Sequence, residues 1–477
     1  MIKDQIRIHA HQSFEVKLDF PVMDFSSGTT DFGMDMFLFL PPALDTNKHN
    51  FTRHDFYRSL KSYIRLATPV YSFAEIADQD SVLNTRLYKS IIPAVAVFEK
   101  KTKNTPNILI KRYASIVNQG LSSEVKRLLL IKNREEQEEA TSLFVQDCFK
   151  MRKWFTELTA TIIDQSTNDD IKKTIRLADE YESLMLEGHL YVLSNGLTTK
   201  LTDGSQAIQS LHKLVLHEMK YRQKAKYPSV AFNHQSNEHV LHRKGRIKRY
   251  IESNLFLNTD TRKEGVFYEQ LFFSLAAGVA MVFATTVAFA SQQVFGNLTL
   301  PFFIALVISY MFKDRIKELT RLYFDRQRKK MLFDFRTTIS IQKNILIGAM
   351  RESFRFERRD FLPPQIREAR ESMRVTKISE EWIGDKVIHY KTKISISSKK
   401  TRRLDDFQGL TQIFRFNISA FTMKMDDHEK EVFIKSKKKL KHQLINRVYH
   451  LNLIFRFTSG NEERYKYYKL ITDKQGI

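Results

Sequence analysis

The chain is 477 residues long, which is enough for two or three domains with separate hydrophobic cores. Hydrophobic residues make up 42% of it and aromatic residues 12%, which excludes a wholly disordered chain. The single cysteine, Cys148, excludes an internal disulfide framework and a cysteine-based zinc or iron–sulfur site. The formal net charge of +23 suits contact with an anionic membrane surface or with nucleic acid.

Residues 1–100 are predicted to form a small β-strand start followed by helices. The two-residue alternation that is typical of a strand is formed by Phe14, Val16, Leu18 and Phe20. The apolar run MDMFLFL predicts a second strand. Thr52 and Asp55 have the spacing of a helix capping box, and apolar residues then recur every three or four positions through Ile64.

Residues 101–265 are predicted to form a cytosolic bundle of helices. From Phe144 to Ile162 the apolar residues are alternately four and three positions apart, which is the spacing of a packed helical seam. Cys148 lies on this seam, so it is interpreted as a buried core residue and not as a nucleophile. The pair Asn195-Gly196 predicts a left-handed turn that ends a long helix.

Residues 271–312 are predicted to form a transmembrane hairpin of two helices, 271–290 and 294–312. The 43 residues 270–312 contain no charged side chain, and at 1.5 Å per residue they could cross a hydrocarbon core of about 30 Å roughly twice. Lysine and arginine lie on both flanks and not in the connecting turn, so both termini are expected in the cytoplasm. The expected location is therefore the plasma (inner) membrane, in a multi-pass topology.

Small residues recur along the first of these predicted helices at Ser274, Ala276, Gly278, Ala280, Ala284 and Ala288. Because lipid provides no hydrophobic drive between helices, small residues that allow close backbone approach indicate a packing face. Packing against the protein's own second helix is the simpler interpretation, and assembly of several hairpins into a homo-oligomer is the alternative. The predicted helices contain no ionisable residue, which argues against a secondary transporter.

Residues 313–360 are predicted to continue the second helix as a basic juxtamembrane helix. Pro363 and Pro364 are expected to end the helical region. Its basic residues are expected to contact anionic lipid headgroups, because positive charge next to a membrane is attracted to them. These expected anchors are Lys313, Arg315, Lys317, Arg321, Arg328, Lys329 and Lys330.

Residues 361–477 are predicted to form a basic, cytosolic, antiparallel β-domain, either a meander or a small barrel. The strand period of two is clearest at Tyr449, Leu451, Leu453, Phe455 and Phe457. A basic interaction face is predicted at Lys435, Lys437, Lys438, Lys439 and Lys441. A solvated edge strand protected by lysines is an equally weighted alternative interpretation of this run.

The predicted fold class is thus an integral membrane α+β protein, with a transmembrane hairpin between a mostly helical N-terminal domain and a C-terminal antiparallel β-domain. The sequence contains no phosphate-binding loop, dinucleotide glycine motif, HExxH zinc motif or nucleophile elbow. We therefore expect no cofactor, no metal site and no catalytic residue. Nucleic-acid binding rests on charge alone, without a supporting motif.

For function, the sequence favours a non-enzymatic, membrane-anchored scaffold or sensor that holds a cytosolic protein partner near an anionic lipid surface. An oligomeric pore or membrane-disrupting effector, gated by the cytosolic domains, is the first alternative, because small residues could join several hairpins. A membrane-tethered enzyme of unidentified chemistry is the second alternative. Perturbed carboxylates or histidines in a pocket would favour the enzyme.

Overall fold

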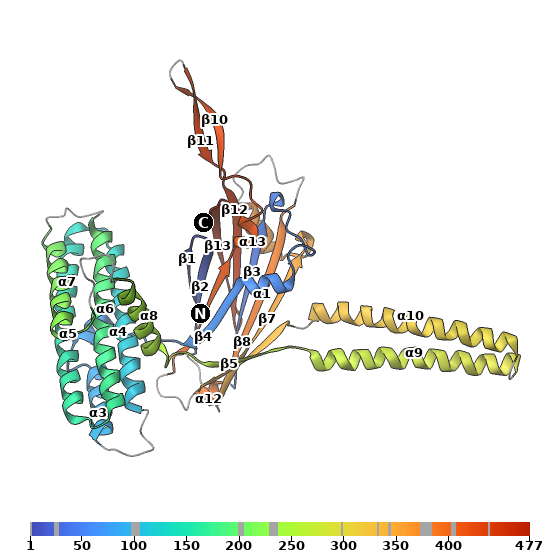
Figure 1. Ribbon diagram of the computed structural model, residues 1–477, viewed down its shortest axis with the longest axis horizontal. Helices are drawn as coiled ribbons and strands as arrows, with labels where there is room; N and C mark the ends of the chain where they lie inside the picture. Colours follow the sequence, from blue (N-terminus) through green and yellow to red (C-terminus); the bar gives the residue numbers. More distant parts are fainter. Residues whose placement is uncertain are drawn as a thin grey trace. The chain divides into compact units, whose positions relative to one another are not determined.

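The computed structural model describes residues 2–22, 28–96, 105–198, 205–228, 237–296, 299–331, 333–341, 345–372, 384–401, 407–436 and 439–477. These residues form a mixture of helices and antiparallel sheets (Figure 1). They divide into two compact units. The first, called the sheet unit below, comprises Met1–Ile64, Asn258–Asp405 and Gly409–Ile477, and the second, called the helical unit, comprises Arg65–Leu257 and Asp406–Gln408.

The larger sheet of the sheet unit has seven strands in the order β13-β12-β3-β8-β7-β6-β5. Their bounds are Glu462–Thr472, Tyr449–Ser459, Thr30–Leu40, Lys386–Ile396, Ile345–Glu357, Phe335–Ile341 and Asn258–Lys263, in that order. The N-terminal strand β3 lies between two strands from the far end of the chain, because Met36 is opposite both Phe455 and Tyr390. Neighbouring strands of this sheet therefore come from distant parts of the sequence.

A second sheet has four strands in the order β1-β2-β9-β4, with bounds Lys3–Ala10, Ser13–Pro21, Gly409–Asn417 and Leu60–Leu66. In the β2–β9 pair, Phe14 is opposite Phe416 and Phe20 is opposite Leu410. Gly409 begins β9 with a φ of 140°, and a Cβ atom there would lie 2.0 Å from the carbonyl oxygen of Phe20. Only glycine fits this close backbone approach.

Strands from the N-terminal and the C-terminal part of the chain thus pair with each other in both sheets. The sequence predicted instead that 1–100 and 361–477 form separate parts of the protein. The order of the strands is also not the consecutive order of the predicted meander. An alternating apolar pattern shows that a segment is a strand, but its partner is chosen by side-chain packing across the sheet. The pattern alone therefore could not indicate that β2 pairs with β9.

Helix α1 (Arg53–Ser59) covers part of the aromatic core of the sheet unit. Thr52 caps it, and the reciprocal hydrogen bonds with Asp55 confirm the predicted capping box. Phe56 is 0% exposed and contacts Phe354, Tyr390 and Phe416, with ring centroids 4.6, 5.2 and 5.3 Å apart respectively. The prediction that the helix continues to residue 64 is wrong, because strand β4 begins immediately after Ser59 and takes the edge position beside β9.

The predicted juxtamembrane helix 313–360 is also corrected, because only its first part is helical. Helix α10 ends at Met331, and strands β6 and β7 follow. In β6 the buried residues Thr337 and Ile339 alternate with less buried ones, which is a strand pattern. The remaining short elements are η1 (Pro42–Leu44), η3 (Arg359–Phe361), α11 (Pro364–Ser372), α12 (Ser398–Thr401) and α13 (Ser419–Thr422).

The helical unit contains α2 (Phe73–Ala77), α3 (Val82–Ala96), α4 (Thr105–Leu130), α5 (Arg134–Gln165), α6 (Asp169–Thr198), α7 (Gln206–Lys224) and α8 (Asn237–Glu252). One hydrophobic core joins these helices, and Cys148 lies within it at 0% exposure, as predicted. The predicted helix end at Asn195-Gly196 is wrong, since α6 continues to Thr198. A Cβ atom at Gly196 would lie 2.4 Å from Leu129, so this glycine permits close helix packing.

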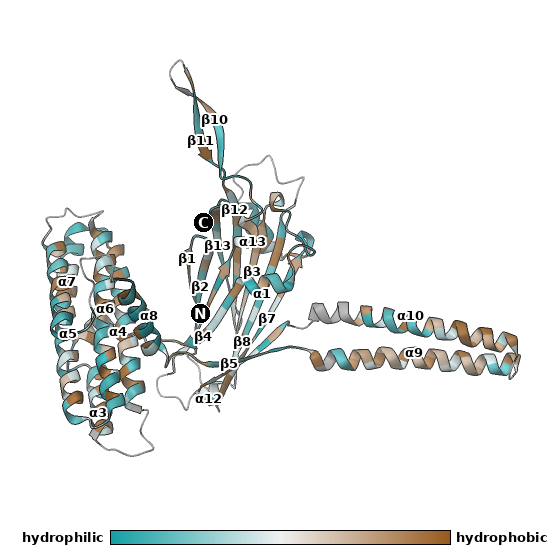
Figure 2. Cartoon of the chain, viewed as in Figure 1, coloured by the Kyte–Doolittle hydropathy of each residue, from teal (hydrophilic) through white to brown (hydrophobic). Residues whose placement is uncertain are grey.

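Helices α9 (Val266–Phe295) and α10 (Leu300–Met331) form an antiparallel hairpin, with apolar residues along α9 and the distal part of α10 (Figure 2). Among the described helices, α9 is the one that is long and apolar enough to cross a membrane, over Glu269–Phe295, and 11% of that segment is buried. The predicted second helix, 294–312, differs from the structure because α9 extends past residue 294. As a result, α10 has only Leu300–Phe312 before its first charge.

Candidate functional site

The surface that α9 and α10 bury between them contains small side chains. Ala276 and Ala280 of α9 are 0% and 2% exposed, and Ser309 of α10 is 2% exposed. The Ser309 hydroxyl donates a hydrogen bond to the backbone carbonyl of Ala284 at 3.4 Å. Small residues let two helix backbones approach closely, and here they join the two helices of one chain.

The six small residues predicted to pack fall into two groups. Ala276, Ala280, Ala284 and Ala288 are buried or half-buried and share one side of α9 at four-residue spacing. Ser274 and Gly278 are exposed, and no heavy atom lies within 4 Å of the position a Gly278 Cβ would take. The Ser274 hydroxyl donates within its own helix, to the carbonyl of Gln270 at 2.9 Å. Of the six predicted residues, the four alanines therefore belong to the contact within the hairpin.

Two aromatic contacts set the register of the hairpin near its base. The rings of Phe272 and Phe324 stack with centroids 4.8 Å apart, and the guanidinium of Arg321 lies 5.0 Å from the centre of the Phe273 ring. The N-terminal half of α9 is therefore beside the charged stretch 313–324 of α10. Only the distal part of α9 is beside the uncharged part of α10.

This register places the expected lipid anchors beside apolar residues of α9. Lys317 and Arg321 are half-buried, whereas Arg315 is exposed. The Lys313 ammonium lies 3.9 Å from the centre of the Tyr310 ring on its own helix. The other expected anchors lie in α10, but their side chains are outside the described part of the structure: Arg328, Lys329 and Lys330.

Asp334 attaches the end of the hairpin to the sheet unit. Its carboxylate, 8% exposed, accepts hydrogen bonds from the Tyr57 hydroxyl at 3.1 Å and the Phe354 N–H at 2.8 Å, and pairs with Arg53 at 3.0 Å. Burial and neighbouring carboxylates raise the pKa of Tyr57, which keeps its hydroxyl a donor. The backbone carbonyl of Asp334 also accepts the N–H of Glu264, just before α9, at 3.1 Å. One residue thus holds both ends of the hairpin.

A pocket of about 500 Å³ lies beside Asp334, lined by Arg53, His54, Tyr57, Lys263, Glu264, Val266, Glu269, Phe333, Asp334 and Phe335. One oxygen of Glu264, Oε1, pairs with Arg351 at 3.3 Å. Its other oxygen, Oε2, is buried and has no hydrogen-bond partner among the residues that the structure describes. Because cations, carboxylates and aromatic rings all line this pocket, its chemistry does not select one class of ligand.

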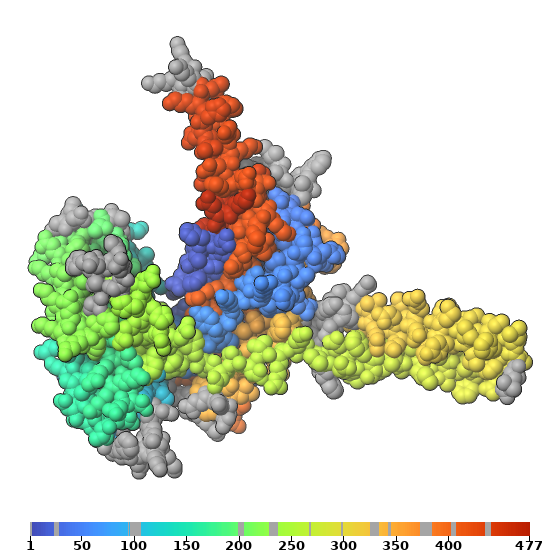
Figure 3. All heavy atoms as spheres, in the orientation of Figure 1, coloured from blue at the N-terminus to red at the C-terminus, as the bar shows by residue number. Residues whose placement is uncertain are grey.

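Three residues of the predicted basic face, Lys435, Lys439 and Lys441, belong to a two-stranded ribbon formed by β10 (Glu429–Ser436) and β11 (Lys439–Asn446), which Figure 3 shows in orange-red. Lys441 is exposed, and the side chains of Lys435 and Lys439 are outside the described part of the structure. The other two predicted members, Lys437 and Lys438, lie outside the described residues altogether. Phe433 and Leu440 are 62% and 71% exposed. The ribbon therefore combines lysines with exposed apolar residues, a combination that the runs VFI and LIN in the sequence could have revealed.

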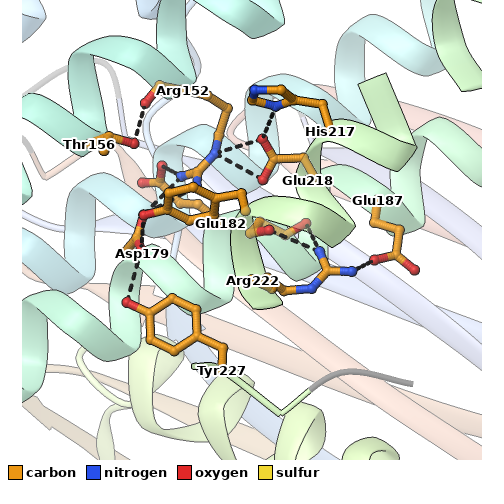
Figure 4. A network of polar contacts seen from close by, with 11 residues as sticks. Arg152, Thr156, Asp179, Glu182, Glu187, His217, Glu218, Arg222 and Tyr227 are labelled. Carbon is orange, nitrogen blue, oxygen red and sulfur yellow. Dashed lines mark hydrogen bonds and ion pairs between the residues drawn. The ribbon is translucent and has the colours of Figure 1, made fainter. Parts of the chain in front are cut away.

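A buried ionic network joins α5, α6 and α7 within the helical unit (Figure 4). The Arg152 side chain, 4% exposed, lies 3.2 Å from Asp179, 3.2 Å from Glu218 and 3.8 Å from Glu182, and each of these carboxylates is 1% exposed. Burial alone would lower the pKa of Arg152, but the three carboxylates raise it, so its guanidinium stays charged.

The three carboxylates of this network differ in how well they are satisfied. Asp179 also accepts hydrogen bonds from the hydroxyls of Tyr221 at 2.6 Å and Tyr227 at 2.9 Å. Neither oxygen of Glu182 has a hydrogen-bond partner among the described residues. Burial raises the pKa of Glu182 well above its usual value, against the opposing effect of Arg152, and so favours its protonated form.

The sequence did not predict this network, because its residues match no catalytic or metal-binding spacing. The one local signal is the run DEYE, residues 179–182, in the middle of a helix that also has a long apolar side. Because the three carboxylates are 1% exposed, they offer almost no surface to a substrate. We interpret the network as an internal connection between three helices.

A second group of charges lies in the larger sheet, where β3, β8 and β12 are neighbours. Asp35, 3% exposed, accepts hydrogen bonds from His389 at 2.8 Å and from Arg456 at 2.8 Å. Burial lowers the pKa of His389, but the hydrogen bonds to Asp35 and to Glu357 outweigh it, so the pKa is raised. Burial raises the pKa of Asp35, but the hydrogen bonds and charges of His389 and Arg456 outweigh it, so this pKa is lowered.

We expect His389 to make the sheet unit more stable at pH 6 than at pH 8.5. A raised histidine pKa stabilises the folded state fully below the unfolded pKa of about 6.5, and this stabilisation is lost as pH rises through the folded pKa. Urea unfolding at both pH values should show a smaller difference for His389→Gln than for the wild type. His54→Gln, at an 83% exposed side chain, is the control and should keep the wild-type difference.

The geometry therefore identifies an exposed helical hairpin with a fixed base, a basic and apolar ribbon, and two buried charge clusters. No protein-family model matches the chain, and neither the curated proteins nor the solved structures contain a match to it.

Proposed function

We propose that the protein is a membrane-anchored scaffold or sensor without catalytic activity of its own. The α9–α10 hairpin is its anchor. The observation that carries this proposal is that α9 is long enough and apolar enough to cross a membrane while only 11% of its apolar segment is buried. Exposed apolar surface of this extent requires a cover, and the uncharged stretch 270–312 suits lipid.

In this proposal the hairpin crosses the inner membrane twice, and both units lie on the cytoplasmic side. Two features support a common side. Strand β5, before α9, pairs with β6, after α10, with Asn258 opposite Ser340 and Lys263 opposite Phe335, so both ends of the hairpin belong to one sheet. Lysine and arginine flank the hairpin and are missing from its turn, as the positive-inside rule expects of a cytoplasmic base.

The ribbon of β10 and β11 is the surface proposed to meet a partner, either a cytosolic protein or the anionic lipid surface. An isolated two-stranded ribbon is only marginally stable in water. Exposed Phe433 and Leu440 next to a lysine run would gain from a surface that is apolar and negatively charged. A membrane-tethered enzyme receives no support from the Arg152 network, because its carboxylates are enclosed.

The membrane anchor is tested by placing charges on the exposed side of α9. Val282 and Phe289 are 67% and 64% exposed, so the double variant Val282→Arg/Phe289→Arg should keep its fold. Each arginine within the hydrocarbon costs about 3 kcal/mol on insertion scales, so two should lower membrane partitioning roughly 10⁴-fold. Flotation of the full-length protein with vesicles of phosphatidylethanolamine and phosphatidylglycerol is the measurement.

The matched control is Leu143→Arg/Tyr191→Arg, which adds the same charges at exposed positions of the helical unit, 55% and 66% exposed. This control should float with the vesicles as the wild type does. If Val282→Arg/Phe289→Arg floats to the same extent as the control, then α9 is not the anchor and the proposal is overturned.

A further inference from the structure

The base of the hairpin combines charged and apolar surface at the same level. Asp314, Arg315 and Glu318 are exposed on α10. Beside this stretch, the N-terminal half of α9 exposes Leu275 at 49% and Val279 at 53%. At the base of the hairpin, α9 therefore has a surface that suits lipid, whereas α10 beside it carries charges of both signs.

The length of the uncharged part makes this a conflict for a single hairpin in a membrane. From Leu300 to Phe312, α10 has about 13 residues, which extend roughly 20 Å at 1.5 Å per residue. The hydrocarbon core is about 30 Å thick. A hairpin that crosses it therefore places Asp314 and Arg315 within the hydrocarbon. Arginine can extend toward the headgroups, but the short side chain of aspartate cannot reach them.

The polar side of α10 is also complementary to itself. Asp314 and Glu318 are four residues apart and so lie on one side of the helix, with Arg315 next to them. The same surface on a second copy would present an arginine to these two carboxylates. In lipid, charged residues face a protein interior or a water-filled space and pair with one another.

We infer that several copies of this chain assemble in the membrane, with the polar sides of their α10 helices turned toward one another. Arg315 of one copy pairs with Asp314 or Glu318 of the next, while the apolar surface of α9 faces lipid. This inference rests on the proposed membrane anchor. The assembly encloses a polar interior in the cytoplasmic half of the membrane, which is the feature a gated pore would need.

The test is the mass of the full-length protein in lipid nanodiscs or mild detergent, measured by light scattering with the lipid or micelle contribution subtracted. The wild type should be an oligomer. Arg315→Glu leaves only negative charges at the three positions, so the mass should fall to that of a single chain. The triple variant Asp314→Arg/Arg315→Glu/Glu318→Arg restores both signs in exchanged places and should assemble again.

The control Arg358→Glu changes a 74% exposed arginine elsewhere in the sheet unit and should remain oligomeric. A wild type that floats with vesicles but has the mass of one chain overturns the assembly and leaves the anchor intact. An Arg315→Glu variant that stays oligomeric overturns the pairing. A wild type that does not float overturns the anchor, and this inference with it.

Discussion

Replacing Arg152 by methionine should destabilise the helical unit by about 3–5 kcal/mol, because a buried ion pair that loses one partner leaves an uncompensated buried charge. Methionine keeps an unbranched apolar side chain about as long as the stem of arginine and removes the guanidinium. Asp179 and Glu218 would then remain in the core, at 1% exposure each, without the Arg152 guanidinium. Glu182 contributes less to this loss, since burial already favours its protonated form.

Trp154 provides a local probe for this change, because it lies in α5 two residues from Arg152 and is 7% exposed. The chain has two tryptophans, so in a Trp382→Phe background urea unfolding followed by fluorescence reports on Trp154. The two units need not unfold together, and a probe inside one unit avoids mixing their transitions. The unfolding midpoint should move to clearly lower urea.

The control is Arg127→Met in α4, which removes an exposed pair with Glu124 and should change stability by less than about 1 kcal/mol. A further variant, Arg152→Met/Asp179→Asn/Glu218→Gln, removes the uncompensated charges and should recover much of the loss. If Arg152→Met lowers the stability as little as Arg127→Met does, then the buried charge does not hold the three helices together.

Replacing Asp334 by alanine should loosen the base of the hairpin by about 2–4 kcal/mol. The substitution leaves two part-buried donors, the Tyr57 hydroxyl and the Phe354 N–H, without their acceptor, and an unsatisfied buried group costs about 1–3 kcal/mol. Arg53 loses its ion-pair partner as well. Because Asp334 lies between α10 and β6, the loss should be local to α1 and the strands at the base.

Hydrogen exchange measured by mass spectrometry on the full-length protein in nanodiscs can resolve this local effect. Exchange in Arg53–Ser59 and Phe335–Ile341 should accelerate roughly 30-fold or more, which corresponds to about 2 kcal/mol. Protection in α5 and α6 should not change. Asp360→Ala, which removes a 75% exposed carboxylate paired with Arg358, is the control and should leave the whole pattern unaltered. Unchanged exchange at α1 would contradict the role given to Asp334.

The features that the sequence predicted correctly depend on residues close together along the chain. The capping box of Thr52 and Asp55 needs a spacing of three residues, and the burial of Cys148 follows from an apolar seam within one helix. Both are set by the helical period of 3.6 residues, so they can be read from a short window. The apolar character of 270–312 is likewise a property of one uninterrupted stretch.

The incorrect predictions concern the ends and the partners of elements. Residues 60–64 have a helical apolar pattern, but β4 forms there because an edge position beside β9 is available. Gly196 lies within a helix, where a Cβ atom would come 2.4 Å from the end of the Leu129 side chain on another helix. In each case a contact with a distant residue outweighs a weak local preference.

The sequence by itself determined that much of the predicted bundle 101–265 is helical, that strands occur near both termini and that one long stretch is uncharged. Only the tertiary structure decided that β3 inserts between β8 and β12, that Asp334 holds both ends of the hairpin, and that the charges of α10 lie beside apolar residues of α9. Side-chain periodicity is encoded locally, whereas pairing and register depend on which distant surfaces pack best together. The buried Arg152 network belongs to the second kind, since its charges come from three helices.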